Sequence, residues 1–235
     1  MASDSLHTLL ANDINKCIRI LSEKFRKWPY NFFTESDAHA YLYYSFFRYG
    51  SPALKKLYYS KDRTKTVLIH REYPTSYRYS QKELIRYSLE RRKGTTIGHY
   101  DMAVLNPTFI ENHKINQVIY KDNKIRQTVQ FDDNHVLAAI EFKLLHKPLS
   151  KGLKEEIKKD FFKLVGALKT GQAKEAYMLI FNRYGKEEKY WRDLAEYQKN
   201  QPSIKLVYQE SYYDKGKHIT LIKSSLQQMY ALRKS

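Results

Sequence analysis

The sequence predicts an α/β protein with a mixed central sheet flanked by helices and with an N-terminal helical extension. Apolar residues in 151–169 recur at steps of three and four, which is typical of an amphipathic helix. A continuous apolar run at 176–182 follows, which indicates a strand covered on both faces. Strand-like runs at 66–74 and 136–145 come earlier, so helices and strands alternate as in α/β folds.

Two helices are expected before the first strand. The apolar spacing in 4–28 predicts a helix that ends at Trp28-Pro29, because proline cannot continue it. A second helix is predicted from Thr34, as its N-cap, to about Tyr49. Gly50-Ser51-Pro52 ends that helix, and the strand at 66–74 follows.

The middle of the chain is less regular. Residues 80–93 are strongly basic and predict a short helix. A strand through Met102–Leu105 then stops at Asn106-Pro107. Residues 108–134 are polar, and we expect an elaborated connection with a short helix or extra strands, the latter at Val118-Ile119-Tyr120 and Thr128-Val129.

The last third again alternates between the two patterns. A helix is predicted at 186–200, a strand at 204–208 and an edge strand at 219–222. The chain carries no convincing repeat, low-complexity tract or linker, so residues 1–235 are predicted to form a single domain.

The charge balance points to a polyanionic partner. Lys and Arg total 42 and Asp and Glu total 25, which gives a formal net charge of +17. An excess of this size favours nucleic acid. Two basic sets are candidates for phosphate contacts. The first is Arg86, Arg91, Arg92 and Lys93, and the second is Lys147, Lys151, Lys154, Lys158 and Lys159.

The remaining composition excludes several classes of protein. One cysteine, Cys17, rules out an internal disulfide and a cysteine-rich zinc site. No apolar run reaches the roughly 20 residues that a membrane span needs. No secretory signal is evident, so we expect a cytoplasmic protein with no membrane partner. Phosphate-binding loops, dinucleotide fingerprints and nucleophile elbows are absent from the sequence.

Two short polar segments adjoin the apolar strands at the centre of the predicted sheet. Asp101 precedes the run Met102–Leu105, and Glu141-Phe142-Lys143 follows the apolar run 136–140. Residues i and i+2 of a strand share a face, so Glu141 and Lys143 point the same way. Charged groups beside a buried run are costly unless they are paired or bound. Two carboxylates and a lysine suit a hard divalent cation and a phosphate.

This pattern resembles the active site of the PD-(D/E)xK phosphodiesterases, the restriction-endonuclease-like nucleases. The resemblance implies that Asp101 and Glu141 bind metal, that the Phe142 carbonyl is a third ligand, and that Lys143 positions or deprotonates the attacking water. Tyr100 stands where the family often has proline. The order of elements also matches, which implies a restriction-endonuclease-like core at 31–182. Residues 1–30 would then be an N-terminal helix and 183–235 an additional helix and strands.

Other acidic and basic residues are candidates for the same site. Many members of the family place an acid on the first core helix, and Glu35 fits that position; an acid there also complements the helix dipole without any catalytic role. Glu72 lies on the strand before Asp101 and is a weaker candidate. Asp160 and Lys163 lie on the helix after Glu141, where solvated charges are the plainer interpretation.

The resemblance implies a metal-dependent nuclease that uses Mg²⁺, with Mn²⁺ as a substitute, and cuts DNA rather than RNA. A nucleic-acid-binding module or complex subunit that kept the fold without cutting is the main alternative. A scaffold whose positive charge is incidental is a third. A homodimer would suit double-strand cleavage, but no interface pattern supports it in the sequence.

Overall fold

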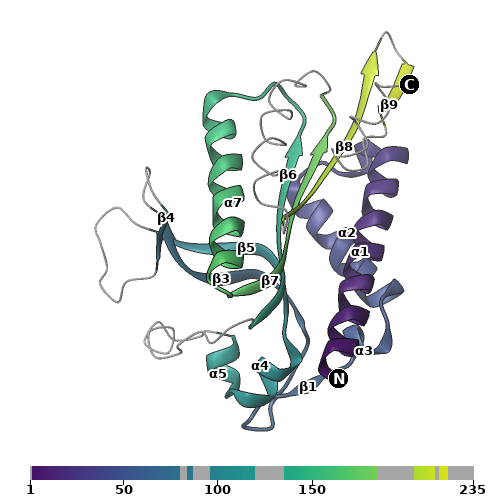
Figure 1. The fold of residues 1–235 in the computed structure, drawn as a ribbon. Helices are drawn as coiled ribbons and strands as arrows, with labels where there is room; N and C mark the ends of the chain where they lie inside the picture. The colour runs from purple at the N-terminus through teal and green to yellow at the C-terminus, as the bar shows by residue number, and fades with distance from the viewer. Residues whose placement is uncertain are drawn as a thin grey trace, which may run out of the picture.

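A seven-stranded sheet forms the centre of the described part of the chain (Figure 1). The structure is a computed structural model that describes residues 2–79, 84–86, 96–119, 135–184, 204–214 and 217–221. The strand order is β4-β3-β5-β6-β7-β8-β9. Figure 1 shows α7 on one face of this sheet and the pair α1 and α2 on the other.

The sheet is mixed. Its first four strands, β4, β3, β5 and β6, pair antiparallel, whereas β6, β7 and β8 are parallel and β9 returns antiparallel. The bounds are β3 Ile69–Tyr79, β4 Leu84–Arg86, β5 Thr96–Leu105, β6 Val136–Leu145, β7 Ala173–Asn182, β8 Ile204–Asp214 and β9 Lys217–Leu221. The predicted α/β class with a mixed sheet, flanking helices and an N-terminal helix is confirmed.

Helices cover both faces of the sheet and fill the connections. They are α1 Ala2–Lys27, the 3₁₀ turn η1 Pro29–Asn31, α2 Glu35–Tyr49, α3 Pro52–Lys55, α4 Pro107–Asn112, α5 Ile115–Val118 and α7 Lys151–Lys169. A two-stranded hairpin, β1 Tyr58–Tyr59 with β2 Lys65–Thr66, lies apart from the main sheet.

The start of α2 is fixed by its own sequence. Thr34 is the N-cap, and Asp37 closes a capping box because its carboxylate accepts hydrogen bonds from the Thr34 N–H and hydroxyl. Ala38, Leu42 and Phe46 bury the inner face of the helix. The predicted cap and helix end are therefore confirmed.

Helix α7 begins and ends where its periodicity predicts. The Ser150 hydroxyl accepts the Leu153 N–H as an N-cap, and Ile157, Phe161 and Leu164 face the core. The helix connects β6 to the parallel strand β7, as a crossover of this kind requires. This position brings its polar residues over the middle of β6.

The structure corrects several local predictions. Residues 84–86 form strand β4 rather than helix, and Ile115–Val118 is a helical turn where strand was one of the options. Strand β3 continues past Pro74, because its register on β5 shifts between Pro74 and Arg78 and the ladder tolerates proline at such an irregularity. The predicted helix at 186–200 and the strand-like Thr128-Val129 lie outside the described residues.

Candidate active site

Five of the predicted site residues meet in one cluster of ion pairs. The Lys143 Nζ lies 2.9 Å from Asp160 Oδ2 and 3.9 Å from Glu35 Oε1. The Lys163 Nζ lies 3.1 Å from Asp160 Oδ1 and 2.5 Å from Glu141 Oε1. A continuous chain of alternating charges thus runs from Glu35 through Lys143, Asp160 and Lys163 to Glu141.

Asp101 lies beside this row of alternating charges, where β5 and β6 stop pairing. The last pair of their ladder before the site is Met102 with Ile140. One residue further on, the Asp101 Oδ2 accepts a hydrogen bond from the Phe142 N–H at 2.7 Å. The sequence therefore predicted correctly that Asp101 and the Glu141-Phe142-Lys143 segment come together.

Helix α2 brings Glu35 to the same place. Glu35 is the first residue of the helix, and the Thr34–Asp37 capping box holds that first turn. Its Oε2 accepts a hydrogen bond from the Leu144 N–H at 3.3 Å. Glu35 therefore contacts β6 through both its ion pair with Lys143 and this backbone contact.

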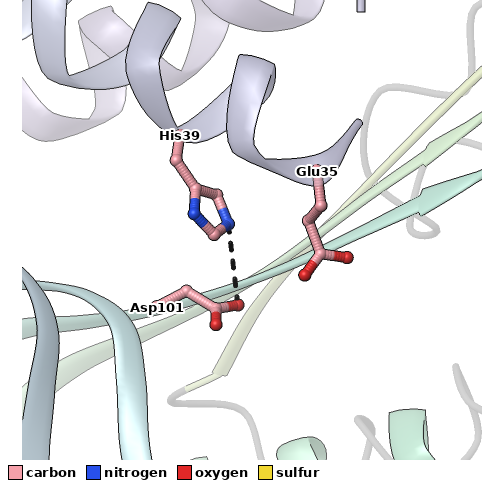
Figure 2. Close-up of side chains that lie close together, drawn as sticks. All are labelled: Glu35, His39 and Asp101. Atoms are coloured by element: carbon pink, nitrogen blue, oxygen red, sulfur yellow. Dashed lines mark ion pairs between the residues drawn. The ribbon is translucent and has the colours of Figure 1, made fainter. Parts of the chain in front are cut away.

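His39 joins the cluster one helical turn after Glu35. Figure 2 shows Glu35 and His39 descending from α2 toward Asp101, with the His39 Nε2 3.9 Å from Asp101 Oδ2. The imidazole is 4 % exposed, and its ring centroid lies 4.4 Å from that of Phe142. No atom of the described residues makes a hydrogen bond to Nε2, so a buried polar atom points into the cluster without a partner.

The other imidazole nitrogen faces a cation. The Arg71 Nη2 lies 3.4 Å from His39 Nδ1, and a guanidinium can only donate. As long as no metal ion is bound to His39, this contact favours the tautomer with its proton on Nε2, facing Asp101. Burial lowers the pKa of His39, more than the nearby Asp101 raises it, so the ring is neutral near pH 7.

Glu35, His39 and Asp101 fit a divalent cation. One donor atom from each lies within 4.8 Å of the others. The 3.9 Å between Nε2 and Oδ2 is too long for a hydrogen bond, but it is below the maximum of about 4.4 Å that can separate two ligands bound to one ion at about 2.0–2.2 Å each. The unpartnered Nε2 is the observation that makes this fit specific, because acidic groups by themselves are common. Binding through Nε2 requires its proton to move to Nδ1, and Arg71 then has to leave its 3.4 Å contact with Nδ1, because two donors would face each other.

The charge of the cluster also favours a bound cation. If all four carboxyls (Glu35, Asp101, Glu141 and Asp160) are ionised, they outnumber the two ammonium groups (Lys143 and Lys163) by two negative charges. Burial raises the pKa of Glu35 to about 7, with Lys143 opposing and Asp101 adding to the rise. Burial also raises the pKa of Glu141 well above its usual range, although Lys163 opposes that rise.

The two lysines are held in the charged form. Burial by itself would lower the pKa of Lys143, but the Asp160 and Glu35 carboxylates outweigh it and raise that pKa. Glu141 and Asp160 raise the pKa of Lys163 in the same way, and its Nζ also donates to the His99 carbonyl at 2.7 Å. Lys143 is therefore a hydrogen-bond donor in this site and not a ready proton acceptor.

Glu141 is less accessible than the sequence suggests. Its side chain is 1 % exposed, and its carboxylate is occupied by Lys163. It can reach a cation beside Asp101 only if Lys163 moves. Phe142 contributes its N–H to Asp101 and its ring to His39, whereas the predicted role of its carbonyl as a ligand stays a prediction.

Glu72 lies on β3 in an unusual backbone conformation. Its φ is +50°, in the left-handed region, between residues that pair with β5 on either side of Asp101. Burial and then Asp101 raise the pKa of Glu72. A strained non-glycine residue beside charged side chains is often found at functional sites. Glu72 thus borders the cluster, and its predicted role in the site stays a prediction.

The predicted phosphate-binding residues are only partly described. Arg86 ends β4, opposite Tyr77 of β3, whereas Arg91, Arg92 and Lys93 lie outside the described residues. The second basic set lies before and along the first half of α7. Lys147, Lys151 and Lys159 are exposed there.

Sequence reasoning missed His39 and Arg71. A single histidine on an apolar helix face carries no chemical signal of its own. The available hint was its spacing of four residues from Glu35, which places both side chains on one face of a helix. Arg71 becomes relevant only through the tertiary contact with His39.

No family model, curated protein or solved structure matches this chain. Among the helices of the described residues, none has both the length and the apolar character needed to cross a membrane. The chemistry of the cluster is therefore argued from its geometry.

Proposed function

We propose that the protein is a metal-dependent phosphodiesterase that hydrolyses nucleic acid. The observation that carries this proposal is the convergence of Glu35, His39 and Asp101 around a buried, unpartnered imidazole nitrogen, with Lys143 alongside. These side chains come from α2, β5 and β6, three segments far apart in the sequence. Their negative excess is matched to a divalent cation, and oxygen ligands with one imidazole suit Mn²⁺ as well as Mg²⁺.

A divalent cation held by these residues would polarise the scissile phosphate and stabilise the negative charge that builds on its oxygens. The residues themselves divide the remaining work. Lys143, charged and 14 % exposed, donates a hydrogen bond that orients the attacking water and offsets the developing charge. Asp160 accepts from Lys143 and Lys163 together, so it keeps both ammonium groups in place.

The arrangement of the sheet supports a restriction-endonuclease-like core, which we propose for residues 31–182. Strands β3, β5 and β6 form an antiparallel meander, and α7 then leads to the parallel strand β7. The candidate site lies where the second and third strands of that meander separate. The net charge of +17 supports a nucleic acid substrate, and the same resemblance favours DNA over RNA.

A direct test compares the wild type with Asp101→Asn on plasmid and single-stranded DNA in the presence of Mg²⁺ or Mn²⁺. The amide keeps the shape of the carboxylate but removes a charged ligand, so cleavage should fall by about a hundredfold or more. Asp62→Asn is the matched control, because Asp62 lies on the turn between β1 and β2. Equal cleavage by wild type and Asp101→Asn would refute the proposal.

One observation favours a second candidate, a nucleic-acid-binding module that does not cut. Lys163 already neutralises Glu141, and Lys143 already neutralises Asp160. A cluster that supplies its own cations needs less from a metal. Calorimetric titration with Mn²⁺ separates the two candidates: heat that disappears in Asp101→Asn supports the phosphodiesterase, and its absence in the wild type supports the inert module.

A further inference from the structure

Three exposed aromatic side chains occupy the connection between α1 and α2. Trp28, Tyr30 and Phe33 are 51 %, 47 % and 75 % exposed. The segment is nevertheless anchored, because the neighbouring Phe32 is 2 % exposed, with its ring centroid 5.7 Å from that of Phe25 and 5.9 Å from that of Tyr41. Packing of Phe32 into the core fixes the chain, so Phe33 is directed to solvent by the fold.

Basic side chains accompany these rings. The Lys24 Nζ lies 4.1 Å and the Lys27 Nζ 5.9 Å from the Trp28 ring, and the Arg183 Cζ lies 5.5 Å from the Tyr30 ring. We call these six residues (Trp28, Tyr30, Phe33, Lys24, Lys27 and Arg183) the aromatic surface. Asp37 lies near Arg183 of this surface, and its carboxylate is engaged by Thr34 in the capping box.

The aromatic surface adjoins the candidate active site. Phe33 precedes Glu35 by two residues. On the other side, the Arg183 N–H donates to the Leu145 carbonyl at 2.7 Å, two residues beyond Lys143 on β6. An extended polymeric ligand that contacts these rings would therefore reach the cluster of Glu35, Lys143 and Asp101 as well.

We propose that the aromatic surface binds single-stranded nucleic acid, whose bases stack on Trp28, Tyr30 and Phe33 while Lys24, Lys27 and Arg183 contact its phosphates. Exposed rings can stack only on bases whose faces are free, and a duplex hides those faces. Rings combined with cations bind single strands with little preference for sequence. This inference rests on the proposed function, because it names the form of nucleic acid that the site receives.

The test measures binding without cleavage, by fluorescence anisotropy of a labelled oligothymidylate and of a duplex of the same length in EDTA. The single strand should bind more tightly than the duplex. Phe33→Leu and Trp28→Leu keep apolar bulk but lose the aromatic face, so each should weaken single-strand binding about tenfold. Phe33→Trp should retain it.

Tyr59→Leu is the matched control. Tyr59 is 53 % exposed and has the Lys65 Nζ 5.3 Å from its ring, but it lies on β1, at the bottom of Figure 1, whereas the aromatic surface follows the C-terminal end of α1, in the upper part of that view. This variant should bind the oligothymidylate like the wild type. All the substituted side chains are exposed, and a melting curve for each variant checks that the fold is kept.

Two results would overturn the inference. One is equal affinity for single strand and duplex, with no loss in Phe33→Leu. The other is unchanged oligothymidylate affinity in Phe33→Leu and Phe33→Ser together with loss of binding to phosphatidylserine vesicles in Phe33→Ser, which would assign the surface to lipid. Failure of the proposed function would appear in the cleavage assay, and failure of this inference in the EDTA affinities.

Discussion

At the scale of the residue, two acids in one helical turn behave in opposite ways. Glu35 and Asp37 are separated by two residues, which turns their side chains about 200° apart around α2. The hydrogen bond from the Thr34 N–H lowers the pKa of the half-buried Asp37, whereas burial in the cluster raises the pKa of Glu35 to about 7. Asp37 therefore stabilises the helix, whereas the ionised form of Glu35 lowers the stability of the folded protein.

Glu35→Gln should raise the melting temperature of the metal-free protein at pH 8. The pKa of Glu35 is higher in the folded state than its ordinary 4.5, so stability falls as the pH rises from about 4.5 through 7 and the carboxylate ionises. The amide avoids that penalty and can still accept the Leu144 N–H. Since a third of the side chain is exposed, we expect a gain of only about 2 °C.

The same variant separates stability from function. Mn²⁺ should raise the melting temperature of the wild type, because the ion binds the folded state, and should raise that of Glu35→Gln much less. Glu156→Gln, on the exposed face of α7, is the matched control and should follow the wild type in both measurements. A lower melting temperature for metal-free Glu35→Gln at pH 8 would contradict this account of Glu35.

His135, which is not part of the candidate active site, should make the stability of the protein sensitive to acid. This residue directly precedes β6 and is 1 % exposed, with its ring centroid 5.2 Å from that of Phe109. Burial, with a smaller effect of His113, lowers the pKa of His135 from 6.5 to about 3. The unfolded chain therefore takes up a proton that the folded protein does not, and stability falls as the pH drops from 6.5 toward 3.

The measurement is urea unfolding of the wild type and of His135→Gln at pH 7 and pH 5. The free energy of unfolding of the wild type relative to the variant should fall by about 2 kcal/mol between these pH values, at about 1.4 kcal/mol per pH unit below 6.5. Parallel losses in both proteins would show that His135 does not carry this dependence.

At the scale of the element, glycines at the ends of α2 and α7 have different roles. A Cβ on Gly50 would lie 2.5 Å from the Phe46 carbonyl oxygen and 2.8 Å from Leu54 Cδ2. The backbone oxygen cannot move away without disturbing the end of α2. A Cβ on Gly152, in the first turn of α7, would meet nothing closer than Ser150 Oγ at 4.0 Å.

Alanine substitutions at these two positions should therefore have effects of opposite sign. Gly50→Ala should lower the free energy of unfolding by about 2 kcal/mol, as overpacking against fixed atoms does. Gly152→Ala should raise it by about 0.5 kcal/mol, because alanine is the better helix former. Urea unfolding with an unchanged m-value measures both. Destabilisation by Gly152→Ala, or none by Gly50→Ala, would contradict this interpretation of the two helix ends.

The elements also show what a sequence can predict about this fold. The helix at 151–169 was predicted to the residue, because its apolar stripe, which includes Ile157, Phe161 and Leu164, repeats at steps of three and four. The short elements were not. A three-residue strand such as β4 or a single turn such as α5 has no periodicity to detect, and its conformation is set by the strand or loop it packs against.

At the scale of the whole molecule, the site was predictable only where a local pattern marked it. Asp101, Glu141 and Lys143 adjoin apolar strands. A charged side chain beside a buried strand is costly unless it is paired or bound, so these residues stand out in the sequence alone. His39 carries no such mark, and the ion pair of Glu141 with Lys163 depends on how α7 lies across β6. Contacts between residues of different elements depend on how those elements pack, so they can be identified only from the tertiary structure.

The distribution of charge over the molecule provides the last prediction. The whole chain has a formal charge of +17, whereas the carboxyl groups of the candidate site outnumber its ammonium groups by two. A positive exterior attracts a nucleic acid from a distance, and the local negative charge then has to be balanced by a cation before a phosphate can approach. Binding in EDTA should therefore depend on the basic side chains alone. Cleavage should depend on the basic side chains and on a divalent cation in the candidate site.

The affinity for single-stranded oligothymidylate in EDTA should fall linearly with salt on logarithmic axes, with a slope set by the number of phosphate contacts. Lys27→Gln, which removes a cation from the aromatic surface, should reduce that slope by about one contact. Lys65→Gln, beside Tyr59, is its control and should leave the slope unchanged. An affinity that hardly responds to salt would mean that the positive charge is incidental, and it would favour an interaction protein over either nucleic-acid function.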